Sequence, residues 1–532
     1  MRLFPLLLLL LPVACATAPR PASLPERAAG WWGDVETLAA DGMEGRAAGS
    51  EGFRRASEHV AARFADEGLE PAGENGGYYQ AVTLEERRII AERSRAALAI
   101  DGAAAALSIP GDIFFRISGG PPPETVDAPL TFIGYGLHLP EAGHDDLAGV
   151  DLRGRIAVAM AGNGPAGIAG ALKSHARAER SRLLAERGAV GVILVNIPAA
   201  GEQPWTSLSR LGETPGMYPA SAAARPVAAP FLTAYFNPAA AERLFAGSGH
   251  SFADISAAAA SSLPLPGFAL RPRLAASVAT ESRTITTRNV VARLPGRDPR
   301  LAAEHVVLTA HLDGLGIGRP VNGDPIYNGA LDNAAGVAAL LDIAGQFRRQ
   351  RARPRRSILF VALTGEELGL LGSRWFARAP TVPRASIVAD LNYDMALPLF
   401  PLSSVTVLGA EESSLGADAR AIGAQLGLPL VPDPFPERNS FIRSDQYSFI
   451  ESGIPALAFK FGFAAGTPEA ETERAWRATR YHGPSDDVAQ SVFREDEIRL
   501  HDFIAALALR IANADARPRW NDDSFFRRFA RD

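Results

Sequence analysis

The chain has 532 residues, of which 47% are apolar and 21% are charged, and its formal net charge at pH 7 is −5. A chain of this length exceeds one ordinary core, so two or three domains are expected. The negative charge argues against nucleic acid or a polybasic membrane surface as a partner. Because Cys15 is the single cysteine, an intrachain disulfide is excluded, and any metal must be held by His, Asp and Glu rather than by thiolates.

The first 27 residues predict an export signal followed by a linker rich in proline and alanine. A mainly apolar run follows Arg2 and is too short to span a bilayer. The segment Val13-Ala14-Cys15 resembles a bacterial lipoprotein signal, in which the cysteine carries a lipid anchor at the new N-terminus. Ordinary cleavage after Ala16 is the alternative. We therefore expect an exported protein, either a periplasmic or membrane-anchored lipoprotein or a secreted protein.

Two further regions differ in their patterns. Residues 31–72 predict two amphipathic helices joined by a glycine-rich turn, and the second helix ends at Gly68. From about 100 to 280, short strand-like runs alternate with turns around one helical segment at 175–189. Paired acids and histidines do not follow the strand ends in that second region. We therefore interpret it as an inserted, mainly-β module without catalytic residues.

From residue 286 to about 513 the rhythm is strand, loop and helix. Buried apolar runs that alternate with amphipathic helices predict an α/β fold, a three-layer α/β/α sandwich whose mixed sheet is largely parallel. In such sheets, ligands bind beyond the carboxyl ends of the strands. The predicted units are a signal and linker at 1–27, a discontinuous α/β domain at 28–100 and 281–516, an insert at 101–280 and a C-terminal tail at 517–532.

Acidic residues and histidines gather at the ends of the predicted strands of the α/β domain. They occur in the motifs AHLDGLG, NGALDNAAG, TGEELGLLGS, LNYDM and YHGPSDD. Each motif alone has an ordinary explanation, since glutamates favour helix starts and a lone loop histidine is common. Together they would require five coincidences at strand ends. The residues in question are His311, Asp313, Asp332, Glu366, Glu367, Asp394 and His482.

Two histidines and three carboxylates suit two zinc ions if one carboxylate bridges them. We interpret Asp332 as the bridge, because a short acid in a tight turn can present both oxygens. Two metals about 3.5–4 Å apart would hold one water, lower its pKa and polarise the carbonyl to be attacked. Of the adjacent Glu366 and Glu367, one can bind metal while the other acts as general base. Asp313 is placed to orient the imidazole of His311.

These five motifs together resemble the co-catalytic di-zinc aminopeptidase family, whose relatives include glutamate carboxypeptidase and the transferrin receptor. The resemblance extends to the helices before residue 73 and to RSDQYSFIESGIPALAF. Residues 130–235 resemble the protease-associated domain that many members carry as an insert. Nearly the whole mature chain is covered, and we therefore expect a bacterial member of the family with an inserted protease-associated domain.

Carried over by motif, the resemblance implies a ligand set for two Zn²⁺. His311 and Asp394 would bind one ion. Glu367 and His482 would bind the other, and Asp332 would bridge the two.

The resemblance also implies roles for residues that do not bind metal. Glu366 would be the general base, and Tyr481 would steady the tetrahedral oxyanion. The peptide bond Asp332–Asn333 would be cis. Gln446 stands where many relatives have a histidine, so substrate preference should differ if this position lines the pocket.

The favoured function is that of an exported zinc-dependent exopeptidase, an aminopeptidase acting on peptides with a free N-terminus. Glu366 and Asp394 could hold the α-amino group. The first alternative is a carboxypeptidase or dipeptidase on the same scaffold, for which Arg438 or Arg443 would supply a basic pocket for the terminal carboxylate. The others are a glutaminyl cyclase with one zinc ion and a non-catalytic binding protein.

Overall fold

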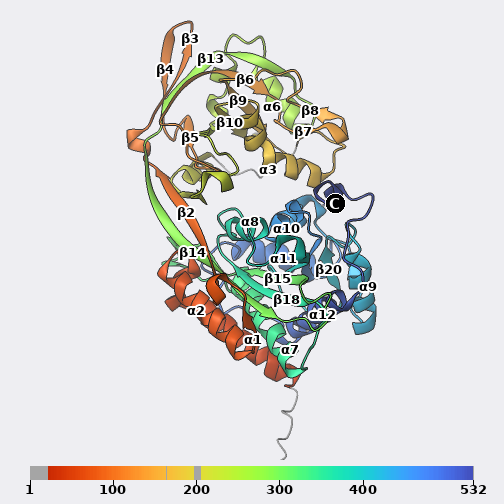
Figure 1. Cartoon of the computed structure of the whole chain (residues 1–532). Helices are drawn as coiled ribbons and strands as arrows, with labels where there is room; N and C mark the ends of the chain where they lie inside the picture. The colour runs from red at the N-terminus through yellow and green to blue at the C-terminus, as the bar shows by residue number, and fades with distance from the viewer. Residues whose placement is uncertain (1–21, 163, 197–204, 531–532) are drawn as a thin grey trace, which may run out of the picture.

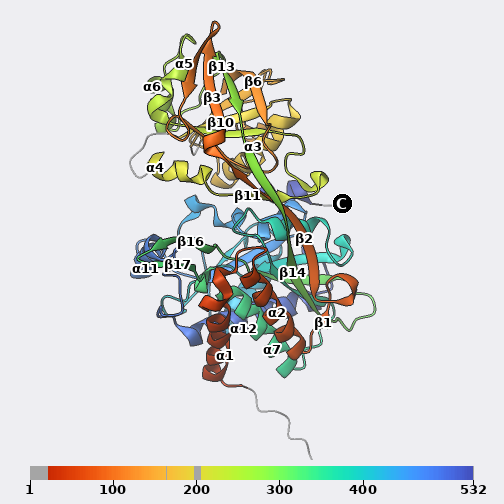
Figure 2. The same cartoon turned by 90° about the vertical axis from the view of Figure 1, so that its left-hand side faces the viewer.

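Two long antiparallel strands join the two domains of this protein. In the computed structural model, which describes residues 22–162, 164–196 and 205–530, β2 (Tyr79–Ile89) pairs along all 11 of its residues with β14 (Thr280–Leu294). The ribbon runs from one domain into the other, as two views show (Figures 1 and 2). The predicted export signal and Cys15 lie outside the described residues. The described helices include none with the length and apolar character that a membrane span requires.

The lower domain in Figure 1 is built on a ten-stranded sheet with the order β11-β2-β14-β18-β15-β19-β22-β20-β21, in which β1 also pairs with β14. Four neighbouring central strands run parallel, and β14 and β20 flank them in the antiparallel sense. Every residue of β15, β18 and β19 is buried, which explains their near-continuous apolar sequences. The predicted α/β fold with a mixed sheet is confirmed. The central strands are β15 (His305–His311), β18 (Ser357–Leu363), β19 (Ile387–Asn392) and β22 (Ala456–Phe461).

Helices cover both faces of this sheet, because successive strand side chains point to opposite sides. Val306 and Leu308 pack in the larger core with α1, α2, α7, α9 and α12, whereas Val307 packs with α8 and α10 on the other face. The helices are α1 (Leu24–Leu38), α2 (Glu51–Asp66), α7 (Ala335–Arg349), α8 (Leu371–Arg378), α9 (Leu415–Leu426), α10 (Gln446–Glu451), α11 (Pro468–Thr479) and α12 (Arg494–Asn513).

Helix α1 begins inside the segment predicted to be a linker. The side chain of Ser23 accepts a hydrogen bond from the amide of Glu26, and the Glu26 carboxylate accepts one from the amide of Ser23. This reciprocal capping satisfies donors that the first turn leaves free. Trp31 and Trp32 then pack into the core at 1% exposure, so the helix is fixed by both its cap and its buried face.

The upper domain holds an eight-stranded sheet with the order β4-β3-β13-β6-β9-β10-β12-β5. Its first strand in the chain, β3 (Arg95–Ile100), lies within the predicted 28–100 segment, whereas β11 (Gly216–Pro219) from the predicted insert pairs with β2 in the other sheet. The chain therefore passes between the domains in paired strands rather than in loops. The other strands of this sheet are β4 (Ala103–Leu107), β5 (Ile113–Phe115), β6 (Thr125–Ile133), β9 (Ile156–Ala161), β10 (Gly191–Asn196), β12 (Leu232–Phe236) and β13 (Gly267–Ser277).

The remaining elements are short or lie at the edges of the two domains, with the exception of α3, which packs beside the second sheet. They are α3 (Gly170–Glu186), α4 (Trp205–Leu208), α5 (Glu242–Phe245), α6 (Phe252–Ala260), β1 (Glu70–Pro71), β7 (His138–Leu139), β8 (His144–Asp145), β16 (Gly316–Val321), β17 (Asp324–Tyr327), β20 (Val405–Leu408) and β21 (Leu430–Val431).

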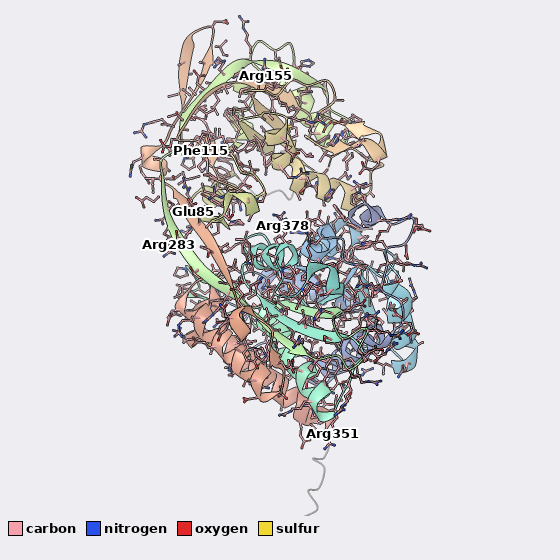
Figure 3. The ribbon with its side chains drawn as sticks, in the orientation of Figure 1. Glu85, Phe115, Arg155, Arg283, Arg351 and Arg378 are labelled. Carbon is pink, nitrogen blue, oxygen red and sulfur yellow. The ribbon has the colours of Figure 1, made fainter. Side chains whose placement is uncertain are left out.

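The two domains also meet away from the ribbon. His175 on α3 shares a hydrogen bond with the hydroxyl of Tyr447 on α10, and its ring contacts Phe525 and Phe529 of the C-terminal segment. At the end of α8, Arg378 donates to the carbonyl of Ala224 in the upper domain (Figure 3). The C-terminal segment is thus part of the contact between the domains rather than a free tail.

Candidate metal centre

The predicted metal-site residues meet at the carboxyl edge of the ten-stranded sheet. His311 is the last residue of β15, Glu366 and Glu367 follow β18, and Asp394 follows β19 by two residues. Because these strands are parallel neighbours, their ends open on one edge of the sheet. Three separate stretches of the chain thereby contribute to one site.

Two more residues reach the same place from loops. Asp332 lies in the turn before α7, and the Asp332–Asn333 peptide bond is cis, as the resemblance implied. His482 lies in the loop after α11 with φ at 56°, a left-handed conformation that is uncommon for a residue other than glycine. The side chains of His311 and His482 both face the carboxylate of Asp332.

The side chains form two triads that share Asp332. Nε2 of His311 lies 3.2 Å from Oδ1 of Asp332 and 3.5 Å from Oδ1 of Asp394. Nε2 of His482 lies 3.3 Å from Oδ2 of Asp332 and 3.2 Å from Oε2 of Glu367. One carboxylate thus presents a different oxygen to each histidine.

The donors of each triad fit a metal ion. In both triads the ligand atoms lie within 4.8 Å of one another. Within the described part of the chain, Nε2 of His311 and Oδ1 of Asp394 are buried without a hydrogen-bond partner, although buried polar atoms normally have one. Imidazole and carboxylate are donors that Zn²⁺ accepts. The residues present therefore suit one ion in each triad, with Asp332 between them.

The pKa shifts in the cluster reflect how closely its buried acids and histidines are packed. Burial raises the pKa of Glu366 well above its usual range, and burial together with Asp332 raises the pKa of Glu367 to about 6. Burial alone would lower the pKa of His482, but the carboxylates of Asp332 and Glu367 raise it to about 10. A bound cation would favour the ionised form of these carboxylates.

Asp313 connects the loops that follow β15 and β18. Its carboxylate oxygens accept hydrogen bonds from the amides of Glu366 at 3.1 Å and Glu367 at 3.3 Å. Nδ1 of His311 lies 3.2 Å from the backbone carbonyl of Asp313 and 3.9 Å from its carboxylate. The backbone oxygen is therefore nearer to the imidazole, while the side chain holds the two glutamates.

Two residues that sequence reasoning missed hold the turn of Asp332. The carboxylate of Asp486 accepts hydrogen bonds from the amides of Leu331 and Asp332, each at 3.0 Å, and from Gln490 at 2.6 Å. Asp486 belongs to the YHGPSDD motif, so its position in the loop of His482 was the available signal.

The second missed residue is Arg46, which is fully buried between the first two helices. Its guanidinium donates to the carbonyls of Leu312 at 2.8 Å, Asn328 at 2.6 Å and Gly329 at 2.9 Å. These carbonyls belong to the loops that carry His311 and Asp332. An arginine in a glycine-rich turn is expected to be exposed, and no local sequence pattern indicates that Arg46 is buried.

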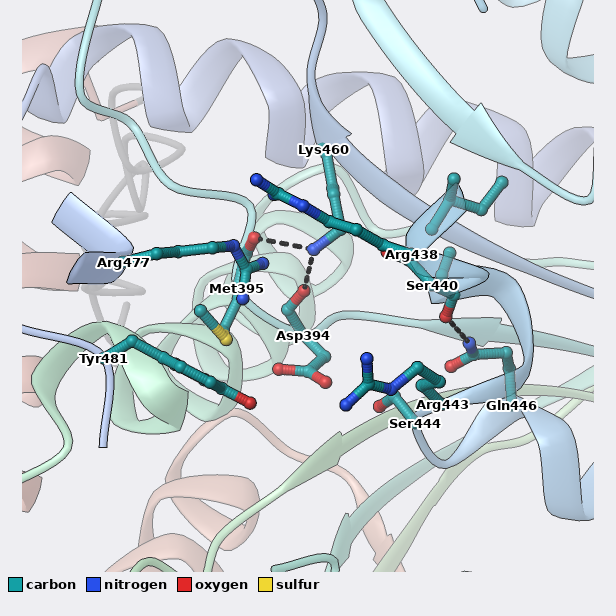
Figure 4. A pocket seen from close by; sticks show the side chains of 12 residues that line it. Asp394, Met395, Arg438, Ser440, Arg443, Ser444, Gln446, Lys460, Arg477 and Tyr481 are labelled. Carbon is teal, nitrogen blue, oxygen red and sulfur yellow. Dashed lines mark hydrogen bonds between the residues drawn. The ribbon is translucent and has the colours of Figure 1, made fainter. Parts of the chain in front are cut away.

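Tyr481 and Gln446 line a cavity beside the metal centre. The ring of Tyr481 stacks on His482, with 3.8 Å between the ring centroids, and its hydroxyl points toward Asp394 (Figure 4). The cavity has a volume of about 310 Å³, and Asp394 and Gln446 form part of its wall. A substrate group in this cavity would lie directly beside the metal ligands.

An α/β/α fold that carries two histidine–carboxylate triads at its strand ends is characteristic of metallohydrolases. Residues 289–507 match the family model described as peptidase family M28. This segment of the α/β domain therefore matches that family, and the recognition made from the motifs is confirmed.

Known relatives match only part of this chain. Leupeptin-inactivating enzyme 1 of Streptomyces exfoliatus is 28% identical over 227 residues, which cover 40% of this chain and 47% of the relative. Aminopeptidase YwaD of Bacillus subtilis is 25% identical over 221 residues, which cover 40% of this chain and 42% of the relative. The chain thus spans less than half the length of these curated relatives. The solved aminopeptidase from Aneurinibacillus sp. strain AM-1 shares the fold, with a TM-score of 0.51 at 18% identity. The match covers 93% of this chain and 94% of that one.

Proposed function

We propose that this protein is a zinc-dependent aminopeptidase that removes N-terminal residues from peptides. The observation that carries the proposal is the pair of triads joined by Asp332, with Glu366 beside them and a cavity in front. His311, Asp332 and Asp394 would hold one zinc ion, and Asp332, Glu367 and His482 the other. When bound, zinc supplies Lewis acidity, which activates water and polarises a carbonyl. The family and the aminopeptidase relative support this reading.

Glu366 is the carboxylate of the site that belongs to neither triad. Its amide is held by Asp313, which fixes the start of its side chain at the site. A carboxylate oxygen of Glu366 would accept the proton of the attacking water and then pass it to the leaving amine nitrogen, as the C–N bond breaks and the new C–O bond remains. The products are a free amino acid and a peptide shortened by one residue.

Tyr481 and the acids of the site would position the substrate. The Tyr481 hydroxyl would donate a hydrogen bond to the oxyanion that forms on the attacked carbonyl. The carboxylates of Glu366 and Asp394 would hold the protonated α-amino group, so that a peptide with a free N-terminus is preferred.

We further propose that the chain is exported and that Cys15 carries a lipid anchor. Labelling of intact cells with a radioactive fatty acid, compared between wild type and Cys15→Ser, tests the anchor.

The test of function uses a panel of aminoacyl 4-nitroanilides with free and acetylated N-termini, with and without a chelator. We expect hydrolysis of the free substrates only, with loss on chelation and recovery with zinc. Elemental analysis should find two zinc ions per chain. Hydrolysis that survives acetylation would contradict the aminopeptidase assignment, and activity unaffected by complete removal of metal would contradict the metal chemistry.

Glu366→Ala separates the base from the metal ligands. Because Glu366 belongs to neither triad, the variant should retain two zinc ions, while kcat falls by about 10²–10⁴-fold through loss of proton transfer. Metal content and kcat are measured on the same sample. Near-normal turnover in Glu366→Ala would remove this residue from the role of base.

A further inference from the structure

The cavity beside the metal centre has a strongly cationic wall (Figure 4). Four basic residues line it, and the single carboxylate in the lining, Asp394, belongs to a metal triad. The basic residues come from three separate segments: a loop after β21, strand β22 and helix α11. They are Arg438, Arg443, Lys460 and Arg477.

These positive charges have few negative partners. Arg438 pairs with Glu473 at 2.7 Å, and Arg477 pairs with the same carboxylate, so two cations share one anion. Nζ of Lys460 donates to the backbone carbonyls of Asp394 at 3.4 Å and Met395 at 3.1 Å. Its hydrogen-bond partners are therefore neutral, and the carboxylates of Asp394, Glu473 and Asp433 act on its charge only from a greater distance.

Arg443 is exposed at the wall of the cavity and points toward Asp394 in Figure 4. Across the residues that the structure describes, no carboxylate lies within 4.0 Å of its guanidinium. Arg177, on α3 of the other domain, donates to the carbonyl of Gly162 and the hydroxyl of Ser174, both neutral. Burial lowers the pKa of Arg177, and the nearby charge of Arg443 lowers it further. Like charges held this close favour the binding of an anion.

Gln446 fixes the loop that presents Arg443. Its side-chain oxygen accepts a hydrogen bond from Asn392 at 2.7 Å, and its amide nitrogen donates to the carbonyl of Phe441 at 2.9 Å. Its polar atoms are therefore engaged by the protein rather than by substrate. The charge that selects a ligand in this cavity comes from the arginines and the lysine.

Resting on the proposed aminopeptidase function, we propose that this cavity binds a carboxylate of the substrate, so that the enzyme prefers peptides with an acidic group beside the scissile bond. A guanidinium matches the two oxygens of a carboxylate and can bind both at once. A volume of about 310 Å³ accommodates a side chain of the size of glutamate. The carboxylate could be the side chain of an N-terminal Glu or Asp, or the C-terminal carboxylate of a dipeptide.

The experiment compares kcat/KM of the zinc-loaded full chain for paired substrates. Glu- and Leu-4-nitroanilide report on an acidic side chain, and Leu-Ala and Leu-Ala-amide report on a terminal carboxylate. We expect the acidic member of at least one pair to be favoured by about 10- to 100-fold, the range of a hydrogen bond to a charged group, and the favoured pair identifies the source. Ratios near one with active enzyme would overturn this proposal and leave the aminopeptidase function intact. Failure to cleave any substrate would refute both.

Variants of Arg443 test whether its guanidinium selects the acidic substrate. Arg443→Gln should lower the favoured ratio by about 10- to 100-fold, Arg443→Lys should restore part of it, and Arg443→Glu should turn the preference toward Lys-4-nitroanilide. The matched control is Arg510→Gln, an exposed arginine on α12 that pairs with Asp418, and it should leave the ratio unchanged. An unchanged ratio in Arg443→Glu would overturn the proposal.

A binding measurement checks the same point without turnover. Free L-glutamate at millimolar concentration should raise the Tm of the zinc-loaded wild type more than L-leucinamide does, and Arg443→Gln should lose this difference. An equal shift with both amino acids would count against an anion site in the cavity. The melting curve also shows whether each variant is folded.

Discussion

Two buried clusters of histidine and carboxylate lie along the same segment of chain, one just before α7 and one within it, and they differ in how their charges are compensated. In the cluster around Asp342, Arg27 donates to both carboxylate oxygens at 2.7 and 3.1 Å, and Nδ1 of His501 lies 3.0 Å away. Arg27 also pairs with Asp502 at 2.6 Å. This cluster joins α1, α7 and α12 with the protein's own charges.

Among the described residues, no arginine or lysine forms an ion pair with Asp332, Glu367 or Asp394; Arg46 lies nearby but donates to backbone carbonyls. Its ligand atoms face one another, and Nε2 of His311 and Oδ1 of Asp394 lack a hydrogen-bond partner among the described residues, although the Asp342 cluster also holds such atoms, on His501 and Glu497. The comparison teaches that burial of His and Asp together does not by itself define a metal site. The carboxylate of Asp342 is balanced by an arginine of the protein, whereas the carboxylates of the Asp332 cluster pair only with histidines among the described residues.

The largest expected effect comes from Asp332→Asn, which removes the charge shared by the two triads. Both metal sites lose a ligand, so zinc content should fall from two ions to less than one per chain. The kcat/KM should fall by at least about 10³-fold, since the chemistry depends on the metals. Elemental analysis and a steady-state assay measure the two quantities. Two zinc ions retained in Asp332→Asn would rule out the bridging role.

Asp342→Asn tests the compensated cluster. Breaking a buried ion pair costs about 3–5 kcal/mol of folding free energy, and we expect the lower end, because Arg27 keeps Asp502. Urea denaturation measures the loss. The folded variant should still bind two zinc ions, so a loss of zinc without a loss of stability would reverse the assignments of the two clusters.

A smaller effect is expected from Asp486→Ala, which frees the amides of Leu331 and Asp332. Outer partners of metal ligands typically contribute 10- to 100-fold in metal affinity, and zinc competition with a chromogenic chelator measures it. The matched control is the neighbouring Asp487→Ala, whose carboxylate accepts from the amide of Ala489 instead. Equal zinc affinity in the two variants would show that Asp486 does not position Asp332.

The smallest effect is a pH dependence of the Asp342 cluster. Burial opposes ionisation of Asp342, yet His501 and Arg27 hold the pKa of this carboxyl well below its usual range. Burial also lowers the pKa of His501, but the carboxylates of Asp342 and Glu497 raise it, and the net shift is upward. The contribution of Asp342 is therefore lost as pH falls below about 4, and that of His501 is lost as pH rises above about 6.5.

The difference in unfolding free energy between wild type and Asp342→Asn should consequently be largest near pH 5. Urea denaturation at pH 3, 5 and 8 measures this difference, which should shrink at both ends of the range. At pH 8 part of it should remain, because Arg27 is still charged. A difference that is constant from pH 3 to pH 8 would contradict the coupling of the two groups.

The positions of His311, Glu367 and Asp394 could be predicted because parallel strands present their ends at one edge. Apolar runs identify such strands, and the residue after each run is then placed without knowledge of the fold. The position of His482 could not be derived from the strand ends, since this residue lies in a distant loop. Its prediction rested on the family resemblance. The α/β fold itself followed from the alternation of buried runs and amphipathic helices.

Arg46 could not be predicted, and the role of Asp486 was missed, because most of their partners are backbone groups. The carbonyls and amides they bind are the same in every sequence, so no residue type signals the contact. The cationic cavity was foreseen only through Arg438 and Arg443, since Lys460 and Arg477 come from a strand and a helix far along the chain. The pairing of β11 with β2 depends on the arrangement of two domains, which local patterns do not contain.

The contact between α1 and α12 has a consequence for the order in which the protein assembles. These helices lie far apart in the sequence, and both pack in the larger core of the α/β domain. The upper domain, by contrast, has its strands within residues 95–277 and can collapse earlier during synthesis. If the site holds zinc as proposed, its ligands are complete only after His482 has been synthesised, and a nascent chain halted before that residue would not cleave peptides.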